Sequence, residues 1–90
     1  MKISFDPAKR AVTLAARGLD FADALQVFAG VQVMLVDDRQ DYGEVRYQTF
    51  GLLTGRLVQL VWTWRDDARH IISMRKCNER EQARFAGKLG

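Results

Sequence analysis

The spacing of hydrophobic residues changes near residue 31 and divides the chain into a helical part and a strand part. Before residue 31 the segment from Asp20 to Gly30 carries apolar residues at the spacing of one buried helical face, namely Phe21, Ala24, Leu25 and Phe28. After residue 31 apolar residues form short runs or alternate with polar ones, as in strands. The pattern therefore predicts helices first and a sheet afterwards.

A short extended segment and another helix are expected before Asp20. Residues 2–5 read as a strand, and Asp6 and Pro7 together are a helix-start signal. We expect this helix to run to Arg17 and to end at Gly18, because glycine is the usual left-handed terminator. Its apolar stripe is narrow and comprises Ala11, Leu14 and Ala15.

The second half of the chain predicts a four-stranded antiparallel meander followed by a helix. The four strands are expected at residues 31–36, 45–53, 56–64 and 69–76. A polar loop at 37–43 and tight turns join them. Asn78 begins the last helix, with Glu81 in the capping-box position. The fold class is thus α+β, as one domain over residues 1–90, with helices grouped on one sheet face and the other face left to solvent or a partner.

The hairpin formed by residues 56–64 and 69–76 carries the most informative side chains. Strict alternation places Trp62 and Trp64 on one face with Val58 and Leu60. In the second strand it places Arg69, Ile71, Ser73 and Arg75 on one face, and His70, Ile72, Met74 and Lys76 on the other. A hydroxyl beside a guanidinium group can hold a phosphate.

Composition limits the kinds of chemistry open to the chain. Fourteen Lys and Arg residues against eleven Asp and Glu give a net charge of +3, which permits a nucleic-acid partner without demonstrating one. Cys77 is the single cysteine and His70 the single histidine, so an internal disulfide is excluded and a structural metal site is not expected. We expect no cofactor. No signal segment or membrane span is recognisable, so we expect a cytoplasmic location.

Four short strings occur together in a consistent order. They are Phe5-Asp6-Pro7-x-Lys9, Gly18-x-x-Phe21-x-x-Ala24-x-x-Val27-Phe28, Gly43-Glu44-x-Arg46 and Ile71-Ile72-Ser73-x-Arg75. Their order and spacing resemble the BrnT family, the toxin half of a bacterial type II toxin–antitoxin pair. The resemblance extends from Phe5 to about Phe85. The chain departs from the family pattern at Thr13 and at Ala16-Arg17, where the family often has Asn and Lys-His, and at His70, where an arginine is expected.

The resemblance implies a compact fold like that of the RelE-type ribonuclease toxins. It implies metal-independent RNA cleavage that inhibits translation and growth. It also implies a hetero-oligomer with a BrnA-like antitoxin, whose ribbon-helix-helix portion binds the DNA of the operon, so that this chain would meet DNA only indirectly.

RNA cleavage without a metal requires a proton acceptor, a proton donor and stabilisation of charge on the phosphate. We expect Arg46 and Arg75 to bind phosphate, since both lie on predicted strands and carry forked donors. Ser73 could bond a phosphate oxygen. Glu44 could accept a proton or orient Arg46, and His70 could act as an acid or base. The alternative for both arginines is a solvated sheet edge with internal salt bridges.

Further RNA contacts are expected from Lys9 and Arg17 on the first helix, from Lys76, and from Trp64, which could stack on a base. Solvated positions or contacts with an antitoxin are the alternatives. The runner-up function is a non-catalytic module that binds the antitoxin and acts as a co-repressor in a DNA-bound complex. A scaffold without any nucleic-acid role is the third possibility.

Overall fold

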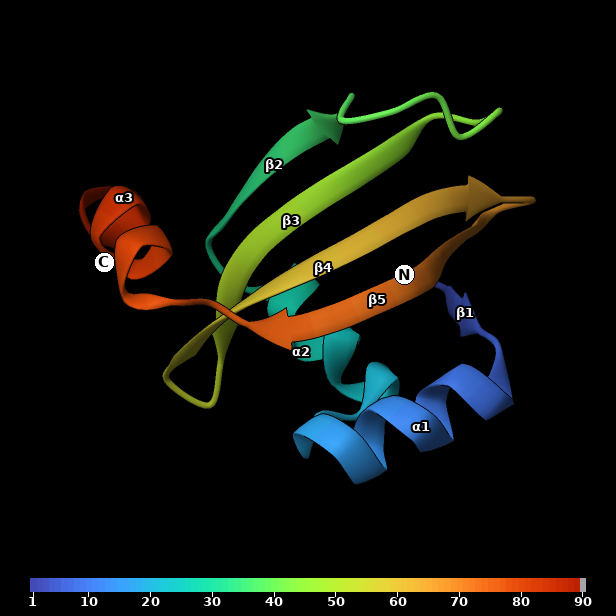
Figure 1. Ribbon diagram of the computed structural model, residues 1–90, viewed down its shortest axis with the longest axis horizontal. Helices are drawn as coiled ribbons and strands as arrows, with labels where there is room; N and C mark the ends of the chain where they lie inside the picture. The colour runs from blue at the N-terminus through green and yellow to red at the C-terminus, as the bar shows by residue number, and fades with distance from the viewer. Residues whose placement is uncertain (90) are drawn as a thin grey trace.

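The computed structural model describes residues 1–89 and has the α+β architecture expected from the sequence (Figure 1). The elements in chain order are β1 (Ile3–Phe5), α1 (Pro7–Arg17), a 3₁₀ turn (Phe21–Asp23), α2 (Ala24–Ala29), β2 (Gln32–Asp37), β3 (Arg46–Leu53), β4 (Arg56–Arg65), β5 (Ala68–Lys76) and α3 (Glu79–Leu89). Within these residues the strands form one sheet with the order β1-β5-β4-β3-β2. None of the helices in residues 1–89 has the length and apolar character that crossing a membrane requires.

The sheet contains the predicted meander and one additional strand. Strands β2 to β5 pair antiparallel with their neighbours, as expected. Strand β1 joins the edge in parallel with β5, where Ile3 pairs with Arg69 and Phe5 with Ile71. The prediction of four strands in the sheet was therefore one strand short, because nothing local in residues 2–5 indicates a partner so far along the chain.

A β-bulge changes which residues of β5 share a face. The pairing of β4 with β5 shifts register between Val61 and Trp62, so that Val61 pairs with Ser73 but Trp62 pairs with Ile71. One extra residue in a strand reverses the direction of the side chains that follow. The prediction that Ile71 and Ser73 share a face was therefore wrong. Instead, His70 shares a face with Ser73 and Arg75.

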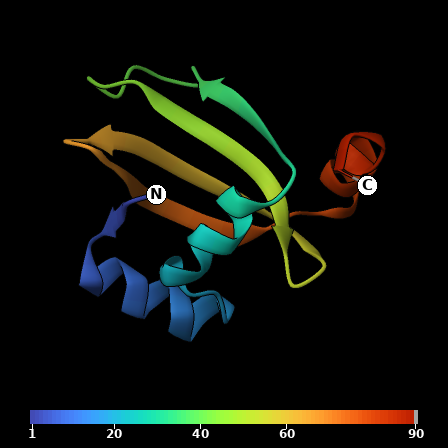
Figure 2. The same ribbon diagram turned by 180° about the vertical axis from the view of Figure 1, so that it is seen from behind.

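The two faces of the sheet differ in character. We call the "helical face" the side that carries Leu60, Trp62, Ile71 and Met74, because these residues form a buried cluster with the 3₁₀ turn and α2. We call the "polar face" the opposite side, which carries Arg46, Gln48, Gln59, Ser73 and Arg75. Figure 2 shows α1 and α2 together on one side of the sheet, with α3 apart at one end.

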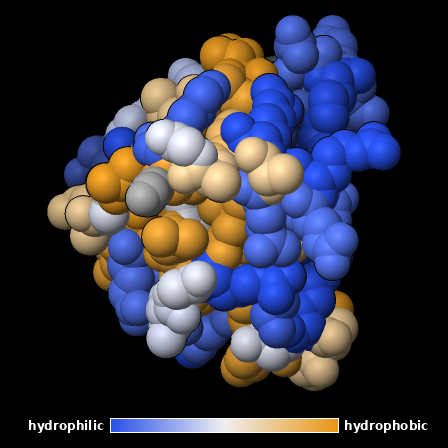
Figure 3. Space-filling view, turned by 90° about the vertical axis from the view of Figure 1, so that its left-hand side faces the viewer, coloured by the Kyte–Doolittle hydropathy of each residue, from blue (hydrophilic) through white to orange (hydrophobic). Residues whose placement is uncertain are grey.

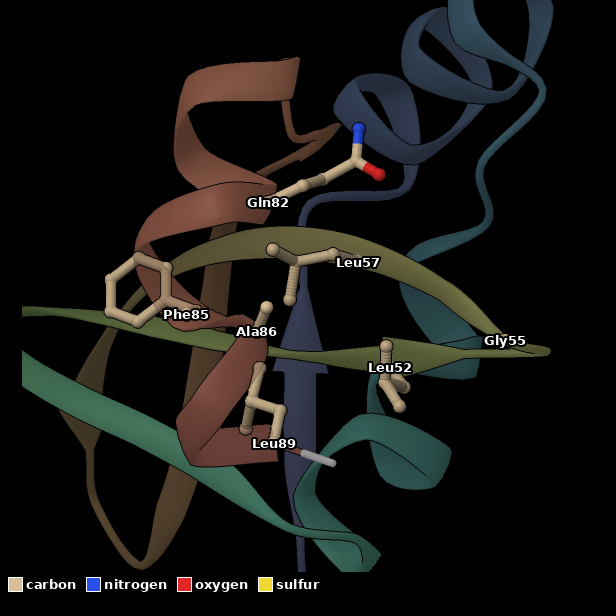
Figure 4. A pocket seen from close by; sticks show the side chains of 7 residues that line it. All are labelled: Leu52, Gly55, Leu57, Gln82, Phe85, Ala86 and Leu89. Carbon is tan, nitrogen blue, oxygen red and sulfur yellow. The ribbon is translucent and has the colours of Figure 1, made fainter.

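Helix α3 covers one end of the polar face, so the helices are not all grouped on one side as predicted. Phe85 is its buried anchor and stacks on Phe50 with ring centroids 4.4 Å apart. Leu57 and Cys77 complete this smaller cluster. An apolar depression lies beside the helix, with Leu52 at its rim (Figures 3 and 4). The capping box is confirmed, since Asn78 and Glu81 bond each other's backbone N–H groups at 2.9 and 3.0 Å.

Helix α1 has the predicted ends but an unexpected inner surface. Asp6 accepts a bond from the N–H of Ala8, and Gly18 adopts a left-handed φ of 69°. No residue of the helix is fully buried, and Leu14 is 44% exposed, so the predicted apolar stripe does not form a core. Polar contacts hold the helix instead. Two nitrogens of Arg10 donate to the carboxylate of Asp20 at 2.7 and 2.9 Å, and Arg17 donates to a backbone carbonyl of β5.

The second helical segment follows its predicted pattern except at one position. It opens with the 3₁₀ turn, capped by Asp20, before α2 begins at Ala24. Phe21, Ala24 and Phe28 are buried as expected, whereas Leu25 is largely exposed. The change from 3₁₀ to α geometry rotates the helix and turns Leu25 outward.

Candidate active site

The part of the polar face beside α3 carries several hydrogen-bonding side chains on β3, β4 and β5. Figure 1 views the sheet from the side away from α2 and shows α3 only at its left end. Register places Gln48, Val61 and Ser73 in one row across β3, β4 and β5, and pairs Gln59 with Arg75 in a parallel row. Gln59 donates to Gln48 at 2.7 Å. Gln59 is buried and holds Gln48 in position, so the accessible part of this surface consists of the partly exposed Gln48, Ser73 and Arg75.

Arg75 is fixed by a carboxylate from the first turn of α3. Its two terminal nitrogens donate to Glu81 at 2.8 and 2.7 Å in a forked pair. The guanidinium hydrogen bonds lower the pKa of Glu81 to about 2, and the same bonds raise the pKa of Arg75. Both groups are therefore charged at neutral pH, and the plane of the guanidinium group is set by the docking of α3.

Arg46 belongs to a network built by the loop after β2. Its Nε donates to Glu44 at 3.0 Å, and its guanidinium group lies 4.2 Å from the ring centre of Tyr42. The Tyr42 hydroxyl donates to the buried Asp37, which also receives two bonds of 2.7 Å from Arg39. These bonds, first among them those from Arg39, lower the pKa of Asp37 to about 2. Arg46 is thus held from two sides.

The sequence interpretation missed Asp37, Arg39 and Tyr42, which it assigned to a polar loop. The Asp-x-Arg spacing directly after an apolar strand was the available signal, because it allows a forked pair two residues apart. That signal is common in turns, and the stacking of Tyr42 under Arg46 depends on the folded path of the loop.

His70 lies on the polar face at the β1 edge with both ring nitrogens engaged. Its Nε2 lies 3.0 Å from a nitrogen of Arg65, which can only donate, so Nε2 accepts. The proton is therefore on Nδ1, which lies 2.9 Å from the Ser4 hydroxyl oxygen. Burial, and next the charge of Arg65, lower the pKa of His70 below its ordinary value. The imidazole is accordingly neutral at pH 7.

Arg46 and Arg75 share the polar face but lie at opposite corners of it. They stand on β3 and β5 with β4 between them, which separates them by about 10 Å across the sheet. Arg75 pairs with Gln59 of β4. Arg46 precedes Tyr47, which pairs with Trp62, so Arg46 lies four positions further along β4 than Arg75. That offset is about 13 Å, so their Cα atoms are about 16 Å apart. This spacing suits two separate phosphates better than a single one.

Two of the four residues expected to contact RNA from elsewhere, Trp64 and Lys76, lie on the helical face. Lys9, by contrast, is near enough to His70 for its charge to lower the pKa of that imidazole, in addition to the larger effects of burial and Arg65. Trp64 is half-exposed on the helical face, where it packs edge-on against Trp62. Lys76 pairs with Val58 on the same helical face. Lys9 is on α1, and Arg17 donates to the Met74 carbonyl at 2.7 Å. The structure places the five candidate site residues on one side of the sheet but in separate groups. Ser73 lies beside Arg75 on β5, Glu44 bonds Arg46 at the opposite corner, and His70 lies at the β1 edge.

The polar face is suited to binding anions through fixed guanidinium groups. Residues 1–89 contain no group of three or more His, Cys, Asp or Glu side chains that could hold a metal ion. The carboxylates present are paired with arginines, so each guanidinium group keeps its orientation before a ligand arrives. Preorganised positive charge of this kind stabilises negative charge that develops on a phosphate.

Comparison with known proteins assigns the family. The sequence model of the BrnT ribonuclease toxins of type II toxin–antitoxin systems matches residues 5–81, a range that includes strands β2 to β5 and Glu81. The comparison with curated proteins gave no match. The matched range covers most of the chain and confirms the resemblance drawn from the four strings. The chain belongs to the BrnT family of ribonuclease toxins of type II toxin–antitoxin systems.

Proposed function

We propose that this chain is a toxin that cleaves RNA internally on its polar face without a metal ion, and thereby inhibits translation and growth. The observation that carries the proposal is the fixed guanidinium group of Arg75, held beside the Ser73 hydroxyl on an uncovered sheet surface. Membership in a family of ribonuclease toxins supplies the reaction class. The proposal adds the location of the chemistry and the residues that perform it.

Cleavage within an RNA strand begins when a ribose 2′-hydroxyl loses its proton and its oxygen attacks the adjacent phosphorus. The bond from phosphorus to the 5′ oxygen then breaks, and that oxygen takes up a proton either from the group that accepted the 2′ proton or from water. Arg75 and Ser73 would bind the attacked phosphate and stabilise its added negative charge. Arg46, positioned by Glu44, would hold a neighbouring phosphate of the same strand.

The proton transfers would involve either His70, at the β1 edge, or Glu44, which lies just before β3 and bonds Arg46. His70 is neutral at pH 7 and can take a proton at Nε2 when Arg65 turns from the imidazole to a phosphate. Glu44 is the alternative acceptor. Lys76 and Trp64 would contribute only if the strand continued around the sheet edge, because they lie on the helical face. Lys9 and Arg17 would contact RNA from α1, and of these two it is Lys9 whose charge adds to the effect of burial in lowering the pKa of His70.

The partner in this proposal is a BrnA-like antitoxin with a ribbon-helix-helix portion. The complex would be a cytoplasmic hetero-oligomer, and the antitoxin would make the contacts with operon DNA. Type II systems neutralise their toxins with a protein, so family membership supports a protein partner.

The test is cleavage of an end-labelled RNA by the purified chain in the presence of EDTA. We expect discrete internal fragments whose formation stops when the antitoxin is added. Cleavage that appears only after Mg²⁺ is restored would contradict the metal-independent reaction. Fragments that shorten progressively from one end would contradict internal cleavage.

One observation favours a second candidate, the non-catalytic antitoxin-binding co-repressor. Arg39, Arg46 and Arg75 each pair with a carboxylate of the chain itself, so a structural role would also satisfy them. Expression of the chain alone from an inducible promoter separates the two candidates. Growth arrest supports the toxin, whereas normal growth together with tighter DNA binding by the antitoxin supports the co-repressor.

A further inference from the structure

The helical face has an uncovered part near the loops that end β2 and β4. Figure 2 views the sheet from the side of α2 and shows neither α1 nor α2 across its upper left part, where β2 ends and β3 begins. Register places Val36, Tyr47 and Trp62 in one row there, with Trp64 and Arg69 paired in the next row. We call the "arginine–aromatic patch" the set Met34, Val36, Val45, Tyr47, Trp64 and Arg69.

The patch exposes large apolar side chains in contiguous positions. Val36 is 61% exposed, Val45 59% and Trp64 51%, and Met34 is similarly open. Isolated exposed apolar residues are ordinary, but a contiguous group on one sheet face indicates an interaction surface. Because β2 is the last strand of the sheet within residues 1–89, the patch extends to an open sheet edge.

Arg69 is the feature of the patch that specifies its ligand. Its guanidinium carbon lies 4.6 Å from the ring centres of both Phe28 and Trp62 and 5.3 Å from that of Trp64. Its Nε is buried and has no hydrogen-bond partner among residues 1–89. Arg69 takes part in none of the salt bridges found within residues 1–89, and burial lowers its pKa. The three other partly buried arginines each pair with a carboxylate, namely Arg10, Arg46 and Arg75.

A partly buried cation without an ionic partner is costly, and a guanidinium group held by aromatic rings is already oriented for an acceptor. The occupant of the patch should therefore bring an anionic group to Arg69 and apolar groups to Val36 and Val45. A nucleic acid would bring the anion but would leave the aliphatic side chains of β2 and β3 without apolar partners. A protein segment with both kinds of side chain matches the whole patch.

The size of the patch indicates the shape of that segment. Val36 on β2 and Arg69 on β5 are three strand spacings apart, about 14 Å. A helix of about ten residues is about 15 Å long and can span this distance. A strand added to the edge of β2 would place its side chains beside Met34 and Val36 but too far from Arg69.

We propose that the arginine–aromatic patch binds an amphipathic helix of the antitoxin, whose apolar side chains cover Val36 and Val45 and whose Asp or Glu pairs with Arg69. This inference rests on the proposed function, because it takes the partner to be the antitoxin. The patch lies on the side of the sheet opposite Arg46 and Arg75, so binding to it and RNA cleavage can be altered separately.

The test measures the affinity of the antitoxin encoded in the same operon for variants of the full chain. Val36→Asp and Arg69→Gln should each weaken binding tenfold or more, while RNA cleavage by Val36→Asp stays at the original rate. Val12→Asp is the matched control, because Val12 is 68% exposed on α1 outside the patch, and its binding should not change. Bound antitoxin should also shield Trp64 from acrylamide quenching.

The other possible results either overturn the proposal or identify a different occupant of the patch. Unchanged affinity in both patch variants, or no binding of the antitoxin at all, overturns the proposal. If Val36→Asp instead abolishes self-association of the chain in sedimentation, a second copy occupies the patch. If the variants weaken RNA binding alone, RNA occupies it. If the unmodified chain cleaves no RNA but the affinities change as expected, the ribonuclease proposal fails and the docking surface stands.

Discussion

The attachment of α3 depends on Phe85, and its removal should open one end of the polar face. Phe85 is the buried residue of this eleven-residue helix, and it stacks on Phe50. The substitution Phe85→Ala should cost about 3–5 kcal/mol. The remaining attachment includes the pair of Arg75 with Glu81, and a surface pair contributes about 1 kcal/mol or less. A helix of this length is marginal in isolation, so α3 should detach before the rest of the sheet unfolds.

Cys77 reports this opening directly, because it lies under α3 in the same cluster as Phe85. Burial raises the pKa of its thiol to about 11, and Cys77 is only 1% exposed, so the closed form should not react at pH 8. A loss of about 3 kcal/mol increases the open fraction roughly a hundredfold. Labelling of Cys77 by a chromogenic disulfide reagent should accelerate by about that factor.

The control separates opening of α3 from unfolding of the whole chain. Val27→Ala removes buried groups from the helical face, away from α3. Its labelling of Cys77 should accelerate only by the factor that its loss of global stability, measured by urea unfolding, predicts. Phe85→Ala should label faster than its global stability predicts. If its labelling follows global stability as closely as that of Val27→Ala, the reasoning that α3 opens independently is refuted.

Two further predictions concern packing and acid stability. Gly51→Ala places a Cβ 2.8 Å from Val27 Cγ1 and should cost about 1–3 kcal/mol in urea unfolding, whereas Gly87→Ala, with open space around it, should be neutral or slightly stabilising. The carboxyls of Asp37 and Glu81 have a pKa of about 2 in the folded chain, below their ordinary values of 3.8 and 4.5. Their stabilisation should therefore be complete above about pH 5 and be lost as the pH falls toward 2, and Glu81→Gln should reduce this loss in thermal unfolding.

Local signals in the sequence predicted the features whose physical cause is local. The ends of α1 follow from Asp6 and Gly18, and the capping box at Asn78 follows from Glu81 three residues later. The strands of the meander follow from alternation and from short turns. These features depend on residues within a few positions of one another, which is why a single sequence is sufficient to predict them.

Features that depend on distant partners were not predictable in the same way. Strand β1 pairs with residues more than sixty positions away, and the bulge opposite Val61 is visible only in the pairing of β4 with β5. The inner surface of α1 is polar because Asp20 and the Met74 carbonyl receive Arg10 and Arg17. Neither acceptor is visible as a partner in the sequence.

The same distinction applies to the candidate site. Arg75, Ser73 and His70 were named from the sequence, and the structure places them on one face. The sequence could not show that Arg75 makes a two-bond ion pair with Glu81, or that the guanidinium group of Arg46 lies over the ring of Tyr42. Both contacts depend on how a helix or a loop packs against the sheet.

The most direct test of the account compares two neighbouring cations that point to opposite sides of the sheet. Arg75 lies on the polar face and Lys76 on the helical face. The assay is cleavage of one labelled RNA with EDTA present. The double variant Arg75→Ala with Glu81→Gln leaves no unpaired carboxylate, and it is compared with Glu81→Gln alone. Its cleavage rate should be lower by roughly a hundredfold or more. Lys76→Ala should cleave at the original rate. An unchanged cleavage rate in the variant that lacks Arg75, or an equally large loss of rate in Lys76→Ala, would contradict catalysis on the polar face.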